Sequence, residues 1–170
     1  MRIKSIVQEK VVTARAALTV TLFFTALFAP LIGVQAVTGP IVNAVLFLAV
    51  IFLGYRSAIW FAVFPSIVAL FIGILPAPMA FFIPFIITAN IVMVTVFDYL
   101  KENYWQGVFV SATAKFIFLF ISSYLLSSFL LTGQMAVRIT TLFGWHQLAT
   151  AVVGGVIAYI IITVAFRKKV

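Results

Sequence analysis

The chain has 170 residues, of which 65% are hydrophobic and only 8% are charged, and its net charge is +8. A soluble domain would carry roughly a quarter charged residues, so this composition excludes an ordinary soluble fold and indicates an integral membrane protein with a single transmembrane domain, residues 1–170. The chain has no cysteine, which excludes disulfides, thiolate metal sites and cysteine-ligated iron–sulfur clusters.

Six hydrophobic runs follow one another along the chain. Only helices and closed barrels satisfy every backbone group in lipid, and these runs lack the alternation of barrel strands. We therefore predict an all-α six-transmembrane-helix bundle, with spans near 16–36, 40–54, 57–75, 80–100, 108–131 and 146–166. The turn-forming stretches "TGP", "GYRS", "LPAP" and "KENYWQG" separate the first five spans. The second run is shorter than the roughly twenty residues that cross a bilayer, so we expect it to begin deeper, tilt little or be partly re-entrant.

The basic residues indicate the orientation of these spans. In a six-span arrangement, nine of the eleven lysines and arginines lie on the side of the two termini. Basic loops stay in the cytoplasm, which predicts that both termini are cytoplasmic. We expect the membrane to be a prokaryotic plasma membrane. The positive charge is thereby explained as a topology signal, and we expect no nucleic-acid partner. Tyr104 and Trp105 are predicted at the inner membrane interface and Trp145 at the outer one.

Lys115 is the one charged residue between Val108 and Leu131. A charge at the centre of a transmembrane helix costs a few kcal/mol, so its position needs an explanation. We place Lys115 about 10 Å from the cytoplasmic surface and Asn90 about 15 Å from the opposite, external surface. The two residues lie on neighbouring antiparallel spans, where they could meet. Two interpretations stay open: Lys115 extends down to cytoplasmic phosphates, or it points inward and is paired. For Asn90, the alternative to ligand binding is that its side chain forms a hydrogen bond between two helices.

A second group of polar and aromatic residues is predicted near the outer ends of the spans. Gln35 ends the first span and Asn43 opens the second; Tyr124, Ser127 and Ser128 lie in the fifth, Arg138 in the external loop, and Trp145, His146 and Gln147 at the start of the sixth. They could line an outward-facing small-molecule cavity, or be ordinary interfacial residues. The candidate ligand-binding residues are therefore Asn43, Asn90, Lys115, Tyr124, Trp145, His146 and Gln147.

Motifs for catalysis or metal binding are missing from the sequence. There is no phosphate-binding loop, HExxH or nucleophile motif, and a single histidine cannot form a metal site alone. Asp98, the one acid inside a span, is predicted near the cytoplasmic end, pairing with Lys101 or Lys115. It does not form a proton relay with other carboxylates. We expect neither an enzyme nor a bound metal or cofactor.

Small residues recur every four positions along the first span, at Ala17, Thr21, Thr25 and Ala29. Such a stripe lets another helix approach closely. We interpret this face as the interface for a partner subunit.

Four stretches stand out beside the six spans and the basic cytoplasmic ends: "AALTVTLFFTALFA", "TGPIVNAVLFLAVIFLGYRSAIWFAVFPSIVALFIGILP", "FIPFIITANIVMVTVF" and "QLATAVVGGVIAYIII". Together these features resemble the substrate-binding S component of an energy-coupling factor transporter. The resemblance implies capture of a vitamin or its precursor from outside, in a pocket built mainly by the fourth to sixth helices. It also implies that the first three helices meet a transmembrane scaffold subunit, and that two cytoplasmic ATPases drive transport. The first-span stripe fits the family's small-residue pattern with threonines in place of two alanines.

The expected function is therefore a substrate-binding subunit for uptake of a small water-soluble compound. The alternative is a free-standing oligomeric carrier or channel. That alternative predicts a continuous polar path across the membrane, and few polar residues lie between Lys115 and the cytoplasm.

Overall fold

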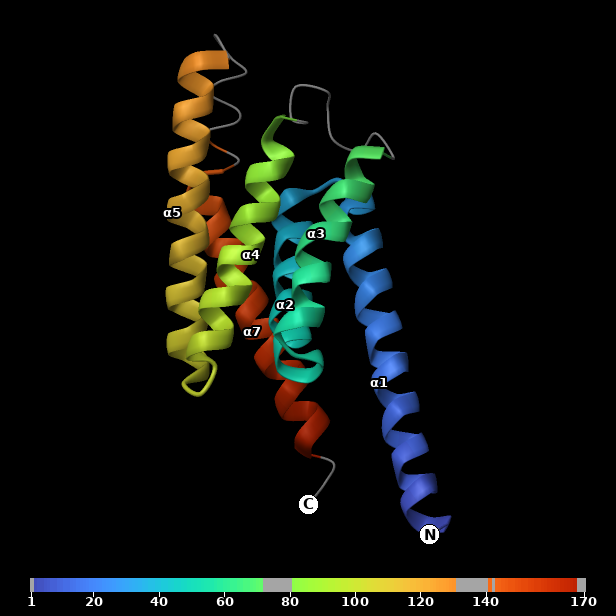
Figure 1. The fold of residues 1–170 in the computed structure, drawn as a ribbon. Coiled ribbons are helices and arrows are strands. Elements are labelled where there is room, and N and C mark those ends of the chain that lie inside the picture. Colours follow the sequence, from blue (N-terminus) through green and yellow to red (C-terminus); the bar gives the residue numbers. More distant parts are fainter. Residues whose placement is uncertain (1, 72–80, 131–140, 142, 168–170) are drawn as a thin grey trace.

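The computed structural model describes the backbone of residues 2–71, 81–130, 141 and 143–167. The side chains of residues 2–11, 69, 127–130, 166 and 167 lie outside this description. Within it the chain is built of helices, in the order α1 (Arg2–Phe28), η1 (Ala29–Ile32), α2 (Gln35–Leu53), α3 (Tyr55–Phe71), α4 (Ile83–Leu100), α5 (Tyr104–Leu130) and α7 (Trp145–Arg167) (Figure 1).

Five of these helices are long and apolar enough to cross a membrane. The candidate spans are Val12–Ile32, Gln35–Leu53, Ile83–Leu100, Tyr104–Leu126 and Trp145–Ala165. The remaining helix, α3, has 17 residues and is slightly shorter. The prediction of an all-α, multi-pass membrane protein is thus confirmed for the described part of the chain.

The helices run up and down side by side, with the start of α1 and the end of α7 at one end of the bundle (Figure 1). The α2–α3 and α4–α5 turns lie toward that same end. Here we call it the terminal end, and the opposite one the far end. Helix α2 is central and packs against α1, α3, α4 and α7, whereas α5 packs mainly against α4 and α7. Every residue from 43 to 50 is buried, because neighbours surround α2 on all sides.

The predicted short second span is wrong, because α2 begins at Gln35 and has 19 residues. The amides of Val37 and Thr38 both donate to the Val34 carbonyl, at 3.0 and 2.9 Å, and start the helix before the "TGP" stretch. Pro40 lies in the second turn, where a proline removes one backbone hydrogen bond without ending the helix. The second run therefore reaches the length of a full transmembrane helix.

Two other helix ends also differ from the prediction. Helix α1 begins at Arg2 instead of near residue 16, so it continues well beyond the apolar run. Helix α5 begins at Tyr104 instead of near 108, because the turn from α4 occupies only residues 101–103 of "KENYWQG". At the α2–α3 turn, Gly54 has a φ of 88°, a conformation that favours glycine.

Glycines on α7 bring it close to its neighbours. A Cβ on Gly154 would lie 2.6 Å from the Asn43 Cβ, and one on Gly155 would lie 2.5 Å from a Val108 methyl. On α2, a Cβ on Gly39 would lie 2.9 Å from Thr150. Small residues permit such close contact between membrane helices. Helix α7 consequently packs tightly between α2 and α5.

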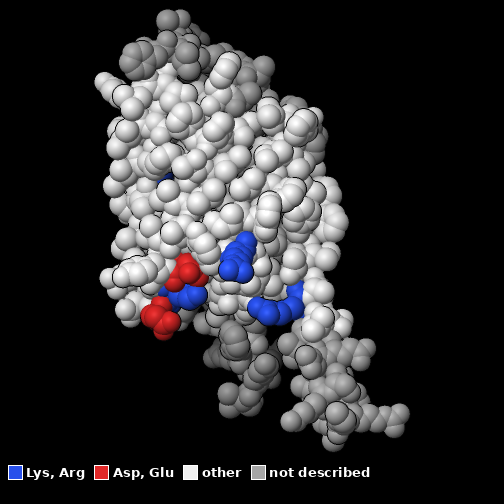
Figure 2. Space-filling model, viewed as in Figure 1, with Lys and Arg blue, Asp and Glu red and all other residues white. Residues whose placement is uncertain are grey.

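The charged side chains gather at the terminal end of the bundle (Figure 2). Among the described residues, Arg15, Arg56, Lys101 and Glu102 are exposed and Asp98 is half-buried. Lys101 Nζ and Asp98 Oδ1 form a 2.7 Å salt bridge, so the prediction that Asp98 pairs with Lys101 or Lys115 is confirmed for Lys101. Lys115 is the exception to the pattern, because it is a charged residue in the interior.

Candidate functional site

Lys115 lies deep inside the bundle, with only 4% of its surface exposed. It follows Tyr104, the first residue of α5, by eleven positions, which is about 16 Å along a helix axis. The predicted depth of about 10 Å was counted from a span that begins near residue 108, whereas α5 begins at Tyr104. Lys115 lies at the middle of the candidate span Tyr104–Leu126.

Asn43 is the hydrogen-bond partner of Lys115. Its Oδ1 accepts a 2.6 Å bond from Lys115 Nζ, and its side chain is 1% exposed. Asn43 was expected at the outer end of the second span. It instead lies well inside α2, ten residues or about 15 Å before Leu53, because α2 begins at Gln35. Lys115 therefore points inward to a neutral amide.

Asn90 lies at nearly the same level on α4, ten residues or about 15 Å before Leu100. It is 4% exposed, and its Nδ2 donates a long 3.5 Å hydrogen bond to the Ala62 carbonyl of α3. Its Oδ1 is buried without a hydrogen-bond partner in the described structure. A buried polar atom of this kind costs about 1–3 kcal/mol, so a native protein rarely carries one without a reason. We call Asn43, Asn90 and Lys115 the polar centre.

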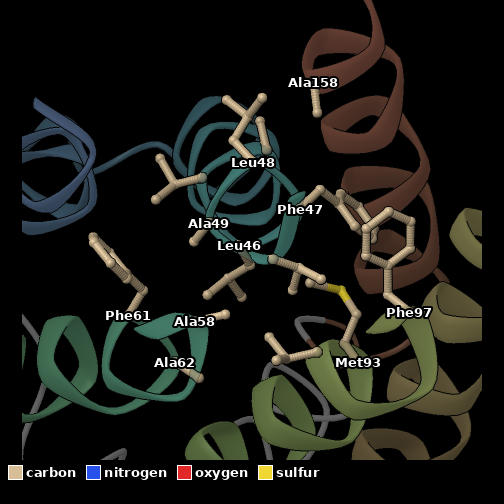
Figure 3. Close-up of a cluster of buried hydrophobic side chains, with 14 of the residues drawn as sticks. Leu46, Phe47, Leu48, Ala49, Ala58, Phe61, Ala62, Met93, Phe97 and Ala158 are labelled. Carbon is tan, nitrogen blue, oxygen red and sulfur yellow. The ribbon is translucent and has the colours of Figure 1, made fainter. Parts of the chain in front are cut away.

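An aromatic group separates the polar centre from the terminal end. The rings of Phe47 and Phe97 meet at 4.6 Å, and Tyr104 contacts Phe97 at 5.7 Å and Tyr159 at 5.4 Å. Figure 3 shows Phe47 of α2 turned toward Phe97 of α4, within the larger apolar cluster. We call these four residues the aromatic floor. The Tyr104 hydroxyl donates a 2.6 Å hydrogen bond to the Gly155 carbonyl, which ties the floor to α7.

A smaller apolar cluster covers the polar centre toward the far end. It consists of Phe82, Ala89, Leu119 and Phe143, with the rings of Phe82 and Phe143 stacked at 5.3 Å. Leu119 follows Lys115 by one turn of α5 toward this end. The polar centre thus lies between two apolar layers.

Three other predicted site residues, Trp145, His146 and Gln147, lie near the start of α7. Trp145 stacks on His146 at 4.2 Å between ring centres, and His146 Nδ1 lies 3.2 Å from the Thr141 carbonyl. Gln147 is buried, and its carbonyl accepts a 3.1 Å hydrogen bond from the Thr150 hydroxyl. These contacts join residues of the 141–150 segment to one another, away from the bond between Lys115 and Asn43.

Two of the predicted aromatic residues lie at the surface of the bundle. Tyr124 is 65% and Trp145 66% exposed. Gln35 is also exposed at the start of α2. Arg138 and the side chains of Ser127 and Ser128 lie outside the described residues.

The small-residue stripe of α1 lies mostly on the outside. Ala17, Thr21 and Thr25 are exposed, and the Thr21 and Thr25 hydroxyls donate to the carbonyls of Ala17 and Thr21. Ala29 is buried, and its carbonyl accepts a 3.1 Å bond from Thr38. The buried face of α1 instead carries Leu22 and Ala26, which join the larger core cluster. Three residues of the stripe therefore face away from the bundle.

Some residues around the polar centre were not predicted. Phe47 follows Asn43 by four positions and Phe97 follows Asn90 by seven, so each lies on the same helical face as its asparagine. Ser111 is fully buried one turn before Lys115 and donates to the Val108 carbonyl. The i, i+4 and i, i+7 spacing of polar and aromatic residues is the signal that indicates them.

No protein-family model, curated protein or solved structure matches this chain. The functional assignment therefore depends on the arrangement of its side chains.

Proposed function

We propose that the chain is the membrane-embedded substrate-binding subunit of an uptake transporter. It binds a small water-soluble compound, a vitamin or precursor, that enters from the external side of a prokaryotic plasma membrane. The observation that supports this proposal is the buried bond between Lys115 and Asn43, together with the buried, unpaired oxygen of Asn90 on the neighbouring helix α4. Ionisable residues inside a membrane are costly and in general mark the path of a substrate or ion.

The aromatic floor favours a binding subunit over a channel or free-standing carrier. Conduction needs a continuous path of polar or hydrated groups. Phe47, Phe97 and Tyr104 lie between the polar centre and the terminal end, where the basic residues predict the cytoplasm. In this proposal a substrate enters from the far end, displaces the smaller apolar cluster around Phe82 and Phe143, and stops at Lys115.

Transport beyond this point requires other subunits. The sequence has no nucleotide-binding motif. In this proposal two cytoplasmic ATPases supply the energy, and a transmembrane scaffold subunit connects them to this chain. Ala17, Thr21 and Thr25 on the outer face of α1 are the proposed contact, because small side chains let a partner helix approach.

Native mass spectrometry of gently purified protein tests the substrate-binding function. Wild type should carry a small molecule that dissociates on activation. Lys101→Met removes an exposed charge at the terminal end and should retain that molecule, whereas Lys115→Met should lose it. A wild-type protein that carries no small molecule and gains none from cell extract would contradict the proposal.

A further inference from the structure

We infer that the substrate carries a carboxylate that binds Lys115, together with a hydrogen-bond donor for Asn90. This inference rests on the proposed substrate-binding function and adds the chemical class of the ligand. It derives from the unmet charge and hydrogen-bond requirements of the polar centre.

The Lys115 ammonium has unused binding capacity. It has three N–H donors, and within the described structure one of them is bonded, to the neutral oxygen of Asn43. The carboxylate of Asp98 is bonded to Lys101 at the terminal end. An amide accepts a hydrogen bond but does not cancel a charge, and a buried charge without a counter-charge is costly. An anionic group on the substrate would supply the missing counter-charge.

Charge balance favours a carboxylate over a phosphate monoester. One ammonium neutralises one negative charge. A phosphate monoester carries about −1.5 to −2 at pH 7 and would leave excess negative charge in the apolar centre. A carboxylate carries a single charge and forms short, strong bonds with an ammonium.

Asn90 adds a second requirement. Its unpaired Oδ1 is an acceptor, so it needs an N–H or O–H group from the ligand. Phe47 and Phe97 touch across α2 and α4, and Asn43 and Asn90 continue those two contacting faces toward the far end. They lie about 6 and 10 Å from that aromatic contact along their helices. A ligand that satisfies both residues would place its carboxylate at Lys115 and its hydrogen-bond donor at Asn90.

The test compares carboxylic acids with their uncharged amides. 4-Aminobenzoate and 4-aminobenzamide, 4-hydroxybenzoate and 4-hydroxybenzamide, and biotin and biotinamide are suitable probes, because each acid carries an N–H or O–H donor besides its carboxylate. Binding is measured as a change in the melting temperature of the full chain in detergent. A ligand that binds the folded state raises the melting temperature, and at a fixed concentration a tighter ligand raises it more. At least one acid should stabilise wild type and the Lys101→Met control while its amide does not. In Lys115→Met its affinity should fall by about thirtyfold or more, as for loss of one partner of a buried charge pair.

Each outcome separates the inference from the proposed function. A compound that stabilises wild type and Lys115→Met equally would leave substrate binding standing and overturn the carboxylate assignment. If no probe stabilises wild type, the carboxylate assignment fails, and the native mass spectrum then decides the function alone. Phosphatidylglycerol should act equally on wild type and Lys115→Met; an effect that needs Lys115 would identify a lipid anion and overturn the assignment. If Lys115→Met does not fold, Lys115→Gln gives the same readout.

Discussion

Lys115 of α5 donates its 2.6 Å hydrogen bond to Asn43 of α2, a residue 72 positions earlier in the chain. The main neighbours of α5 are α4 and α7, so the long lysine side chain crosses between helices that have little direct backbone contact. A hydrogen bond from a charged donor contributes more than one between neutral groups. This bond therefore links the central helix to the outer part of the bundle.

Asn43→Ala should destabilise the protein. The substitution removes the acceptor of a buried ammonium, and hydrogen bonds to charged groups contribute about 1.5–3 kcal/mol. Thermal unfolding in detergent measures the loss. Thr113→Ala on the exposed side of α5 is the control and should change stability by less than about 0.5 kcal/mol. Equal stability of Asn43→Ala and wild type would show that the bond contributes nothing.

Replacing both partners should cost less than replacing one. In Asn43→Leu with Lys115→Met, the buried charge and its acceptor are both exchanged for apolar groups, which is often neutral or stabilising. A double-mutant cycle should give a coupling energy of about 1 kcal/mol or more, measured by the same unfolding assay. Additive single-mutant effects would exclude a direct interaction. The double variant should also lose any carboxylate ligand, because it lacks the Lys115 ammonium. Its stability and its ligand binding would then change independently.

Gly154→Val should disrupt the packing of α2 against α7. Even the first carbon of the new side chain would lie 2.6 Å from the Asn43 Cβ and 2.9 Å from the backbone of Ala44 and Pro40, and backbone cannot move aside cheaply. Overpacking of this kind costs about 1–3 kcal/mol or more. Val153→Ala, on the exposed side of α7, is the matched control and should be nearly neutral. If the two variants unfold at the same temperature, the close contact is not essential.

Tyr104→Phe should weaken the aromatic floor without removing it. The ring is retained, but the Gly155 carbonyl loses the hydroxyl that donates to it at 2.6 Å. The expected loss is about 0.5–1.5 kcal/mol, measured by thermal unfolding. Tyr99→Phe, at an exposed hydroxyl on α4, is the control. Because the floor lies outside the polar centre, ligand affinity in Tyr104→Phe should match wild type, and a large loss of affinity would contradict this separation.

The sequence predicted the helices well because long apolar runs have few alternatives in lipid. It failed at helix ends, where "TGP" was interpreted as a break although Pro40 fits in the second turn of α2. That error placed Asn43 near the membrane surface instead of beside Lys115. The pairing of Lys115 with Asn43 could not be predicted from the sequence either. It depends on how α4 and α7 place α2 and α5 relative to each other. The outward position of Tyr124 was missed because aromatic residues suit both lipid and protein interiors.

The small-residue stripe on α1 should contain two kinds of residue, exposed ones that affect assembly and a buried one that affects stability. Ala17 and Thr21 are exposed, so Ala17→Leu or Thr21→Leu should leave folding and ligand binding unchanged and weaken assembly with a scaffold subunit. Ala29 is buried, so Ala29→Leu should destabilise the chain itself, by about 1–3 kcal/mol for an overpacked core. Thermal unfolding measures the stability of each variant, and co-purification with a tagged scaffold subunit measures its assembly. Val20→Leu, at an exposed α1 position outside the stripe, controls for added bulk. If Ala17→Leu and Val20→Leu assemble equally well, the stripe is not the contact, because close approach would then not depend on its small side chains.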